Sequence, residues 1–389
     1  MDVSIVEDIS TIPAQQWDAL VDKNDPFMEH AFLQVLEQSG SVEAATGWQP
    51  AHVVVHDGET LVGACPVYIK DHSYGEYIFD WGWAEGAQRA GIPYYPKLVT
   101  AAPFTPATGR RLLTGPGAPR EDVIPALVAG IQAVAKAVNA SSFHLLFLTE
   151  AEQAILSSQP ALLARDTHQY HWTNNDYTDF DHWLSTFRSK ARKETRRERR
   201  AAAATVDRIR AVPGNDLGDR EWAAIHRFYI DTCTRKWGTP YLTPEFFSLA
   251  RTQLAHRIIC FVAEKDDDVV ATSLTFQKGT NLYGRYWGCS DSFPALHFEL
   301  CYHAPIALCI ENGWTRFEAG AQGQHKIKRG LMPSVTRSIH WIRHHGLAHA
   351  IDHALQKERK SLHEQLPLLA RHGPFRRNEA NSNEMKEEC

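Results

Sequence analysis

A pattern that recurs about half a chain apart constrains this fold more than any other feature. Segments 52–68 and 260–276 each contain an apolar stretch, a short acidic turn and a second apolar stretch. This order predicts a β-hairpin in each half of the chain. The alternative is chance similarity, because hairpins followed by helices are common.

Both hairpins are expected to continue in the same way. A third, Gly- and aromatic-rich strand is expected at 75–83 and at 283–288. A helix and a strand should follow, at 122–138 with 143–147 in the first half and at 296–310 with 315–319 in the second. We interpret the pattern as two duplicated α/β units.

The length supports this division, because 389 residues are too many for one ordinary hydrophobic core. We expect a first domain at 1–165, a second at 166–370 that opens with a basic helix at 186–204, and a flexible tail at 371–389. Segment 83–119 is a long insertion rich in Gly, Pro and Tyr. Such an insertion predicts a lid or a binding surface.

Composition excludes several classes of protein. The formal charge of −5 gives no global attraction to nucleic acid or membrane, so any polyanion site must be local. The N-terminus has no secretory pattern and no apolar run approaches a membrane span, which predicts a cytoplasmic protein. Seven scattered cysteines without C-x-x-C spacing, and no H-E-x-x-H, predict no disulfide framework, no metal site and no tightly bound cofactor.

A strongly basic segment lies between the halves. Residues 188–200 contain eight Lys or Arg and two Glu, and four alanines follow. These are good helix formers. Four arginines fall on one face and form a candidate phosphate- or RNA-binding set: Arg192, Arg196, Arg199 and Arg200. A solvated helix between domains is the alternative.

A glycine-rich cationic loop at 317–333 is the clearest candidate site. Its three glycines allow main-chain N–H groups to approach a ligand, and its cations attract anions. The candidate residues here are Glu318, Gln322, His325, Lys326, Lys328 and Arg329. An ordinary turn with solvated lysines is the alternative.

Other segments of the second half contribute candidates for a pocket wall. Arg285 is the unusual residue in an apolar strand, and Tyr283 shares its face. Trp237 and Tyr241 either line a pocket or are core aromatics. His297 and Glu299 are candidates for proton transfer, although polar residues near a helix start are usually surface residues.

The first half offers an aromatic, proline-stiffened surface around 79–83, 94–98 and 103–110. Its charged residues, Asp80, Lys97 and Arg110, are candidates for substrate binding. The alternative is a packed loop that covers the sheet, with Asp80 and Arg110 as structural partners.

Five segments together resemble the FemAB-like proteins, a bacterial family linked to peptidoglycan biosynthesis or recognition within the GNAT-fold superfamily. They are YYPKL at 94–98, PFTP at 103–106, YGRYWG at 283–288, LHFE at 296–299 and FEAGAQG at 317–323. The resemblance implies an α/β fold of two tandem GNAT-like domains with mixed, mostly antiparallel sheets flanked by helices.

The related Fem-type ligases move an aminoacyl group from aminoacyl-tRNA to an amine of a cell-wall precursor peptide. Segment 326–331, KIKRGL, is similar to their K-F-K-x-G-F loop, with leucine in place of the last aromatic. The resemblance implies an acyltransferase in which Lys328 acts on the reacting carbonyl or binds substrate. The expected partners are transfer RNA and a small-molecule or peptide amine.

Two other functions stay open. One is an N-acyltransferase that uses acetyl- or acyl-CoA, although we find no R/Q-x-x-G-x-G/A loop for the CoA pyrophosphate. The other is a non-catalytic module that binds cell-wall precursors. The sequence identifies neither the acceptor nor the oligomeric state.

Overall fold

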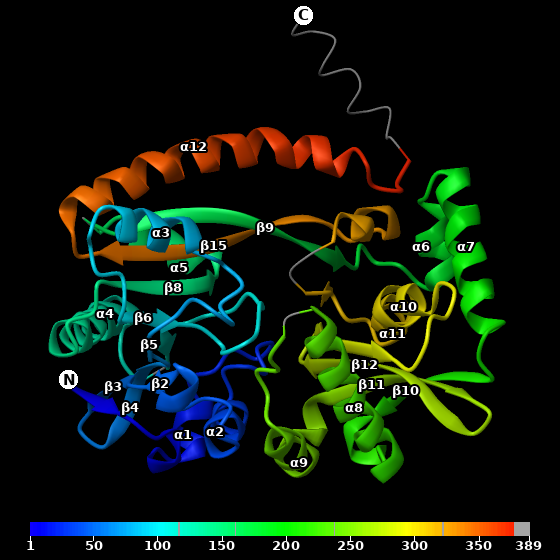
Figure 1. Cartoon of the computed structure of the whole chain (residues 1–389), viewed down its shortest axis with the longest axis horizontal. Coiled ribbons are helices and arrows are strands. Elements are labelled where there is room, and N and C mark those ends of the chain that lie inside the picture. Colours follow the sequence, from blue (N-terminus) through cyan, green and yellow to red (C-terminus); the bar gives the residue numbers. More distant parts are fainter. Residues whose placement is uncertain (116, 160, 237, 321–322, 377–389) are drawn as a thin grey trace, which may run out of the picture.

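The computed structural model describes residues 1–115, 117–159, 161–236, 238–320 and 323–376. Its strands form one large and one small sheet, with helices on their outer faces (Figure 1). The order in the large sheet is β10 (Arg208–Pro213), β11 (Ile258–Lys265), β12 (Asp268–Lys278), β13 (Asn281–Cys289), β14 (Arg316–Glu318), β9 (Leu163–Thr173), β15 (Met332–Ile342), β8 (Ser142–Leu148), β6 (Lys97–Thr100), β5 (Tyr68–Lys70) and β2 (Gln49–Pro50). The order in the small sheet is β1 (Asp2–Val6), β3 (His52–Asp57), β4 (Thr60–Cys65) and β7 (Leu113–Thr114).

Both predicted hairpins are confirmed. They are β3–β4 in the first half and β11–β12 in the second. Each half also contains one parallel pair, β6 with β8 and β13 with β14, next to antiparallel strands. The prediction of a mixed, mostly antiparallel α/β fold is therefore confirmed.

The expected strand at 75–83 is wrong. This segment is a loop that leads into helix α3 (Trp81–Arg89), and β6 takes the place of the missing strand beside β8. The backbone adopts positive φ at Gly75 and Tyr77, which extended strands do not allow. Segment 83–119, predicted as a lid or binding surface, thus also supplies a strand of the large sheet.

The predicted helices agree closely with the structure. Helix α4 (Arg120–Ala137) precedes β8, and the basic helix is α7 (Ser189–Ala203). The helix expected at 296–310 begins as α10 (Leu296–Phe298), passes through a π-helical turn (Glu299–His303) and ends as α11 (Ala304–Glu311) before β14. The remaining α-helices are α1 (Ala14–Asp18), α2 (His30–Gln38), α5 (Glu150–Ser157), α6 (Phe180–Ser185), α8 (Asp219–Lys236), α9 (Pro244–Gln253) and α12 (His345–Ala370).

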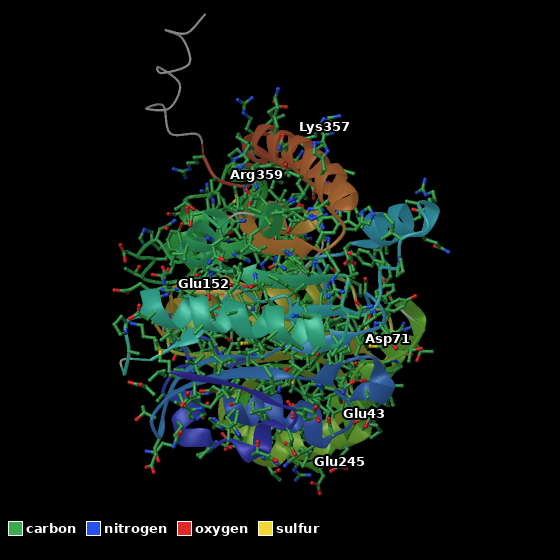
Figure 2. All side chains as sticks on the ribbon, turned by 90° about the vertical axis from the view of Figure 1, so that its left-hand side faces the viewer. Glu43, Asp71, Glu152, Glu245, Lys357 and Arg359 are labelled. Atoms are coloured by element: carbon green, nitrogen blue, oxygen red, sulfur yellow. The ribbon has the colours of Figure 1, made fainter. Side chains whose placement is uncertain are left out.

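The two halves are tied together by the end of the chain. Strand β15 pairs with β8 of the first half and with β9 along most of its length. Helix α12 then lies across β9 and β15, opposite α9 at the other end of the molecule, as Lys357, Arg359 and Glu245 mark in Figure 2. The proposed boundary at residue 165 falls inside β9, and the division into domains stays a prediction.

Apolar packing also joins the halves. The Phe27 ring lies 5.3 Å from that of Phe276 and 5.1 Å from that of Tyr283 on β13.

In the predicted tail, Phe375 packs against Phe187 with ring centroids 5.2 Å apart, whereas residues 377–389 lie outside the described part. None of the helices in the described ranges is long and apolar enough to cross a bilayer.

Candidate functional site

The largest concentration of predicted site residues surrounds a pocket between two diverging parallel strands. Strands β13 and β14 pair only over 281–283 and 316–318. Beyond this point β13 remains paired with β12, whereas the chain after β14 turns away at Gly320, where φ is +80°. The gap holds a pocket of about 490 Å³, which we call the central pocket. Its lining includes Tyr77, Tyr229, Tyr241, Arg285, Tyr286, Trp287, His297, Cys301, Tyr302, His325 and Lys326.

A β-bulge places Arg285 in this pocket. Leu274 of β12 lies opposite Tyr286, but its neighbour Thr275 lies opposite Gly284, so Arg285 is the extra residue on β13. Bulges redirect side chains and are frequent beside functional sites. The Arg285 guanidinium donates a hydrogen bond to the Phe104 carbonyl of the first half and lies 5.1 Å from the Tyr286 ring. The central pocket therefore has walls from both halves.

Tyr283, predicted to share the face of Arg285, does not line the central pocket. Its side chain is buried, and its hydroxyl donates to the Asn24 carbonyl at 2.9 Å. Tyr241 does line the pocket and stacks on Phe104, with centroids 5.1 Å apart and planes 11° apart. Trp237 and Gln322, both predicted to bind substrate, lie outside the described residues.

The cationic loop forms a short 3₁₀-helix, Gln324–Arg329, which we call the pocket loop. Three residues per turn place Lys326 and Arg329 on the same, buried side and leave Lys328 exposed. The Lys326 amine reaches the central pocket and donates to the Gly320 carbonyl at 2.9 Å. Burial lowers the pKa of Lys326 to about 8. The structure thus brings Lys326, and not the predicted Lys328, to the pocket.

His325 and His297 contribute imidazole rings to the same space. The His325 Nε2 atom lies 2.9 Å from the Tyr302 hydroxyl oxygen, and burial followed by the charges of Arg329 and Lys326 lowers the pKa of His325. The ring of His297 packs edge-on against Trp287 at 5.2 Å. Both rings are positioned to contact a ligand in the central pocket.

Helix α7 is joined to the pocket loop by an ion pair that the sequence did not reveal. Arg329 donates from Nε to Glu198 Oε2 on α7 at 3.0 Å and from Nη1 to the His325 carbonyl at 2.9 Å. Its guanidinium also stacks 3.3 Å from the Phe298 ring centroid. No local pattern in the sequence indicates this contact, because Glu198 and Arg329 lie 131 residues apart.

The predicted acids lie elsewhere. Glu299 turns away from the central pocket and pairs with Arg199 of α7, with Nη2 and Oε1 3.0 Å apart. Glu318 is buried beside Arg316 at 2.8 Å, and burial raises its pKa. Neither residue lines the central pocket, so their proposed catalytic roles stay predictions.

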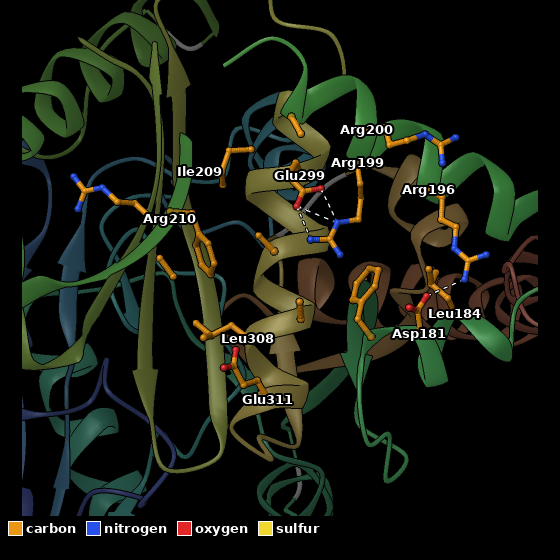
Figure 3. Close-up of a pocket in the computed structure, with 16 residues that line it drawn as sticks. Asp181, Leu184, Arg196, Arg199, Arg200, Ile209, Arg210, Glu299, Leu308 and Glu311 are labelled. Carbon is orange, nitrogen blue, oxygen red and sulfur yellow. Dashed lines mark hydrogen bonds and ion pairs between the residues drawn. The ribbon is translucent and has the colours of Figure 1, made fainter. Parts of the chain in front are cut away.

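Three of the four predicted arginines of α7 border a second depression of about 670 Å³, the α7 groove (Figure 3). Arg196 pairs with Asp181 at 2.8 Å, Arg199 is held by Glu299, and Arg200 extends along the exposed side. Arg192 does not line the groove and donates to the Phe187 carbonyl at 3.2 Å. The cationic face is thus partly neutralised by neighbouring acids.

In the first half, Lys97 and Asp80 form a buried ion network. The Lys97 amine lies 2.5 Å from Asp80 Oδ2 and 2.9 Å from Glu76 Oε2, and all three side chains are almost completely buried. Arg110 lies at the surface and pairs with Asp22 at 3.3 Å. These positions match the structural alternative for Asp80 and Arg110, and none of the three predicted residues lines the central pocket.

Within the described ranges, no three His, Cys, Asp or Glu side chains are grouped closely enough to hold a metal ion.

Comparison with solved structures shows the fold. FemX is 13% identical, with a TM-score of 0.51, and the match covers 90% of this chain and 100% of FemX. The C-terminal domain of a protein from Agrobacterium fabrum assigned as a lysylphosphatidylglycerol synthetase is 9% identical, with a TM-score of 0.53 and coverage of 88% and 95%. A conserved Bacteroides thetaiotaomicron protein of unknown function is 12% identical, with a TM-score of 0.52 and coverage of 88% and 100%.

No curated protein matches this sequence significantly. The model of one protein family, described as peptidoglycan biosynthesis/recognition, matches residues 8–377. The chain therefore belongs to the FemAB-like family.

Proposed function

We propose that this protein is an acyltransferase that moves an aminoacyl or acyl group from an activated ester or thioester to an amine in the central pocket. The observation that carries the proposal is the convergence of Lys326 and Arg285 on a gap between parallel strands. Both strands belong to the second half, while Tyr77 of the first half lines the same pocket, so two substrates can approach the reacting atoms from different directions.

The chemistry follows from the charge state of Lys326. An amine nucleophile must lose a proton as it attacks the acyl carbonyl, and the attacked oxygen gains negative charge. With a pKa of about 8, part of the Lys326 population is neutral near physiological pH and can accept that proton. Arg285 and main-chain N–H groups of the diverging strands can stabilise the oxyanion, and positioning supplies much of the rate.

We propose aminoacyl-tRNA as the donor. The exposed Arg196 and Arg200 face solvent on the helix that Glu198 joins to the pocket loop. Arginine grips phosphate in a bidentate way, and binding to an RNA backbone weakens steeply with salt. A CoA thioester carries only the phosphates of its own nucleotide and needs a less extended cationic surface than an RNA backbone does, so it is the second candidate donor.

The experiment is a transfer assay with charged tRNAs and acyl-CoAs against a panel of amines. We expect transfer from a charged tRNA that falls at least about tenfold in the double variant Arg196→Glu plus Arg200→Glu, since two phosphate contacts become repulsive. The matched control reverses two exposed charges on α12, Lys357→Glu plus Lys360→Glu, and should leave transfer unchanged.

The other outcomes identify the alternatives. Transfer from acyl-CoA that is insensitive to the α7 double variant would select the thioester donor. Saturable binding of a cell-wall precursor with no transfer from any donor would contradict the enzyme and favour the non-catalytic module.

A further inference from the structure

One carboxylate of the basic helix joins three elements at a single point. Glu198 of α7 accepts two hydrogen bonds from Arg329 of the pocket loop, one from Nε to Oε2 at 3.0 Å and one from Nη2 to Oε1. The same Oε2 atom lies 2.9 Å from Nε2 of His303, a completely buried residue that ends the π-helical turn. We call Glu198, Arg329 and His303 the loop anchor.

The loop anchor is directly connected to the central pocket. Tyr302 precedes His303 on the π-helical turn, and its hydroxyl oxygen lies 2.9 Å from Nε2 of His325. Arg329 donates from Nη1 to the carbonyl of the same His325 at 2.9 Å. His325 is therefore held at its ring by the π-helical turn and at its main chain by Arg329. Such turns within helices are frequent at functional sites.

The anchor fixes the end of the pocket loop. The Arg329 guanidinium is 9% exposed, stacks 3.3 Å from the Phe298 ring centroid and pairs with both oxygens of Glu198. A planar guanidinium bound to both oxygens of a carboxylate has one preferred geometry. Lys326 lies one turn of the 3₁₀-helix before Arg329 and on the same side. The position of the Lys326 side chain therefore depends on that pairing.

The anchor also affects the charges around His325. Burial, followed by the positive charges of Arg329 and Lys326, lowers the pKa of His325. Glu198 offsets the nearer source of this effect, because its negative charge is in contact with the Arg329 guanidinium. The titratable and charged groups that face His325 lie on its own loop and on the helix before β14, and they are Lys326, Arg329, His297, Cys301 and Tyr302.

We propose that Glu198 is a positioning residue, which fixes the pocket loop through Arg329 and offsets the Arg329 charge beside His325. The consequence for turnover rests on the proposed function, whereas the effect on His325 does not. Helix α7 would then act in two ways. Its exposed arginines face the proposed donor, and its inward carboxylate orders the residues that line the central pocket.

The test measures the pKa of His325 by NMR in the full-length protein, with ¹³C-labelled histidine and without any substrate. The spectrum of His325→Gln identifies the signal. We expect Glu198→Gln to lower the pKa of His325 and Arg329→Gln to raise it, because the first removes a negative charge and the second a positive one. The double variant should return toward the wild-type value.

A merely structural role of Glu198 gives a different pattern. A loosened loop would admit water to His325 and raise its pKa in both single variants, since burial is the largest cause of the lowered value. Glu198→Asp retains the charge and should keep the His325 pKa near that of the wild type. Glu29→Gln is the matched control, because Glu29 is also 12% exposed and pairs with Arg257 at 2.7 Å, and it should leave His325 unchanged.

The transfer assay supplies a second measurement. Glu198→Gln should lower kcat at least about tenfold and leave KM within about twofold, because the pocket loop acts on the reacting groups and not on the donor surface. A raised or unchanged His325 pKa in Glu198→Gln, a raised one in Glu198→Asp, or a normal kcat in Glu198→Gln would each overturn the proposal. Failure of the proposed function is separate, since it would show as the expected pKa changes in a protein that transfers no acyl group.

Discussion

Two buried lysines, one in each half of the molecule, have pKa values that their surroundings shift in opposite directions. Lys97 is enclosed by the carboxylates of Glu76 and Asp80. Burial disfavours its charge, but the two carboxylates outweigh burial and raise the pKa of Lys97. Lys326 is held by the Gly320 carbonyl, and burial dominates and lowers its pKa.

The difference teaches how one residue type serves two purposes. A buried ammonium with two countercharges stays protonated and fixes its neighbours in place. A buried ammonium with only a neutral acceptor gives up its proton readily and becomes available for chemistry. Lys97 thus fixes the loop from Ser73 to Asp80, whereas Lys326 is suited to act on substrate.

The largest effect should come from removing the Lys97 charge, and it should appear in the free energy of unfolding. In Lys97→Met, two carboxylates stay buried without a countercharge, and we expect a loss of about 3–5 kcal/mol in the free energy of unfolding. Chemical denaturation measures it. Lys265→Met, at an exposed strand end, is the control and should change stability by less than about 0.5 kcal/mol. A loss no larger than that of the control would show that the network is not structural.

Removing the second lysine should affect turnover and spare the fold. Lys326→Met is expected to lower the rate of acyl transfer by about 10²–10⁴-fold, the usual contribution of a general base. Its stability should stay equal to that of the wild type or rise, because a poorly compensated buried charge is removed.

The matched control is Lys328→Met in the same loop, where the side chain is exposed. It should retain transfer within about threefold, whereas a loss as large as that of Lys326→Met would restore the sequence-based choice of Lys328. Circular dichroism and a denaturation curve of each variant separate lost chemistry from lost folding.

The smallest effect is a difference in pH dependence. The folded pKa of Lys326, about 8, lies below its ordinary value of 10.5, so between these values the unfolded chain binds more protons. Stability of the wild type should therefore rise relative to Lys326→Met as pH increases from 8 to 10. Lys97 itself adds no slope there, because a raised pKa loses its contribution only above 10.5. Glu76, whose pKa is raised to about 7, becomes harder to ionise once Lys97 is removed, so the wild type should also gain stability relative to Lys97→Met above pH 7. Denaturation midpoints at pH 7, 8, 9 and 10 measure both differences, and parallel curves for Lys326→Met would contradict the lowered pKa.

Features encoded in local sequence were predicted well. The basic helix was expected at 186–204 and extends over Ser189–Ala203, and both hairpins lie where their acidic turns placed them. These elements depend on propensity and periodicity within one segment. The prediction of a strand at 75–83 was wrong. The aromatic composition of this segment is typical of a strand, but Lys97, from another part of the chain, binds Glu76 and Asp80 and holds the segment as a loop.

In the candidate site, too, some features follow from the local sequence and others depend on contacts between distant segments. The sequence by itself determined that the loop from Gly320 to Gly330 is cationic and contains glycines that allow a close approach to a ligand, and that Arg285 interrupts an apolar strand. Only the tertiary structure decided that Lys326 and not Lys328 enters the pocket, and that Glu198 holds the loop. The physical reason is that burial and pKa depend on contacts between residues far apart in the chain, such as Glu198 with Arg329, which no local pattern specifies.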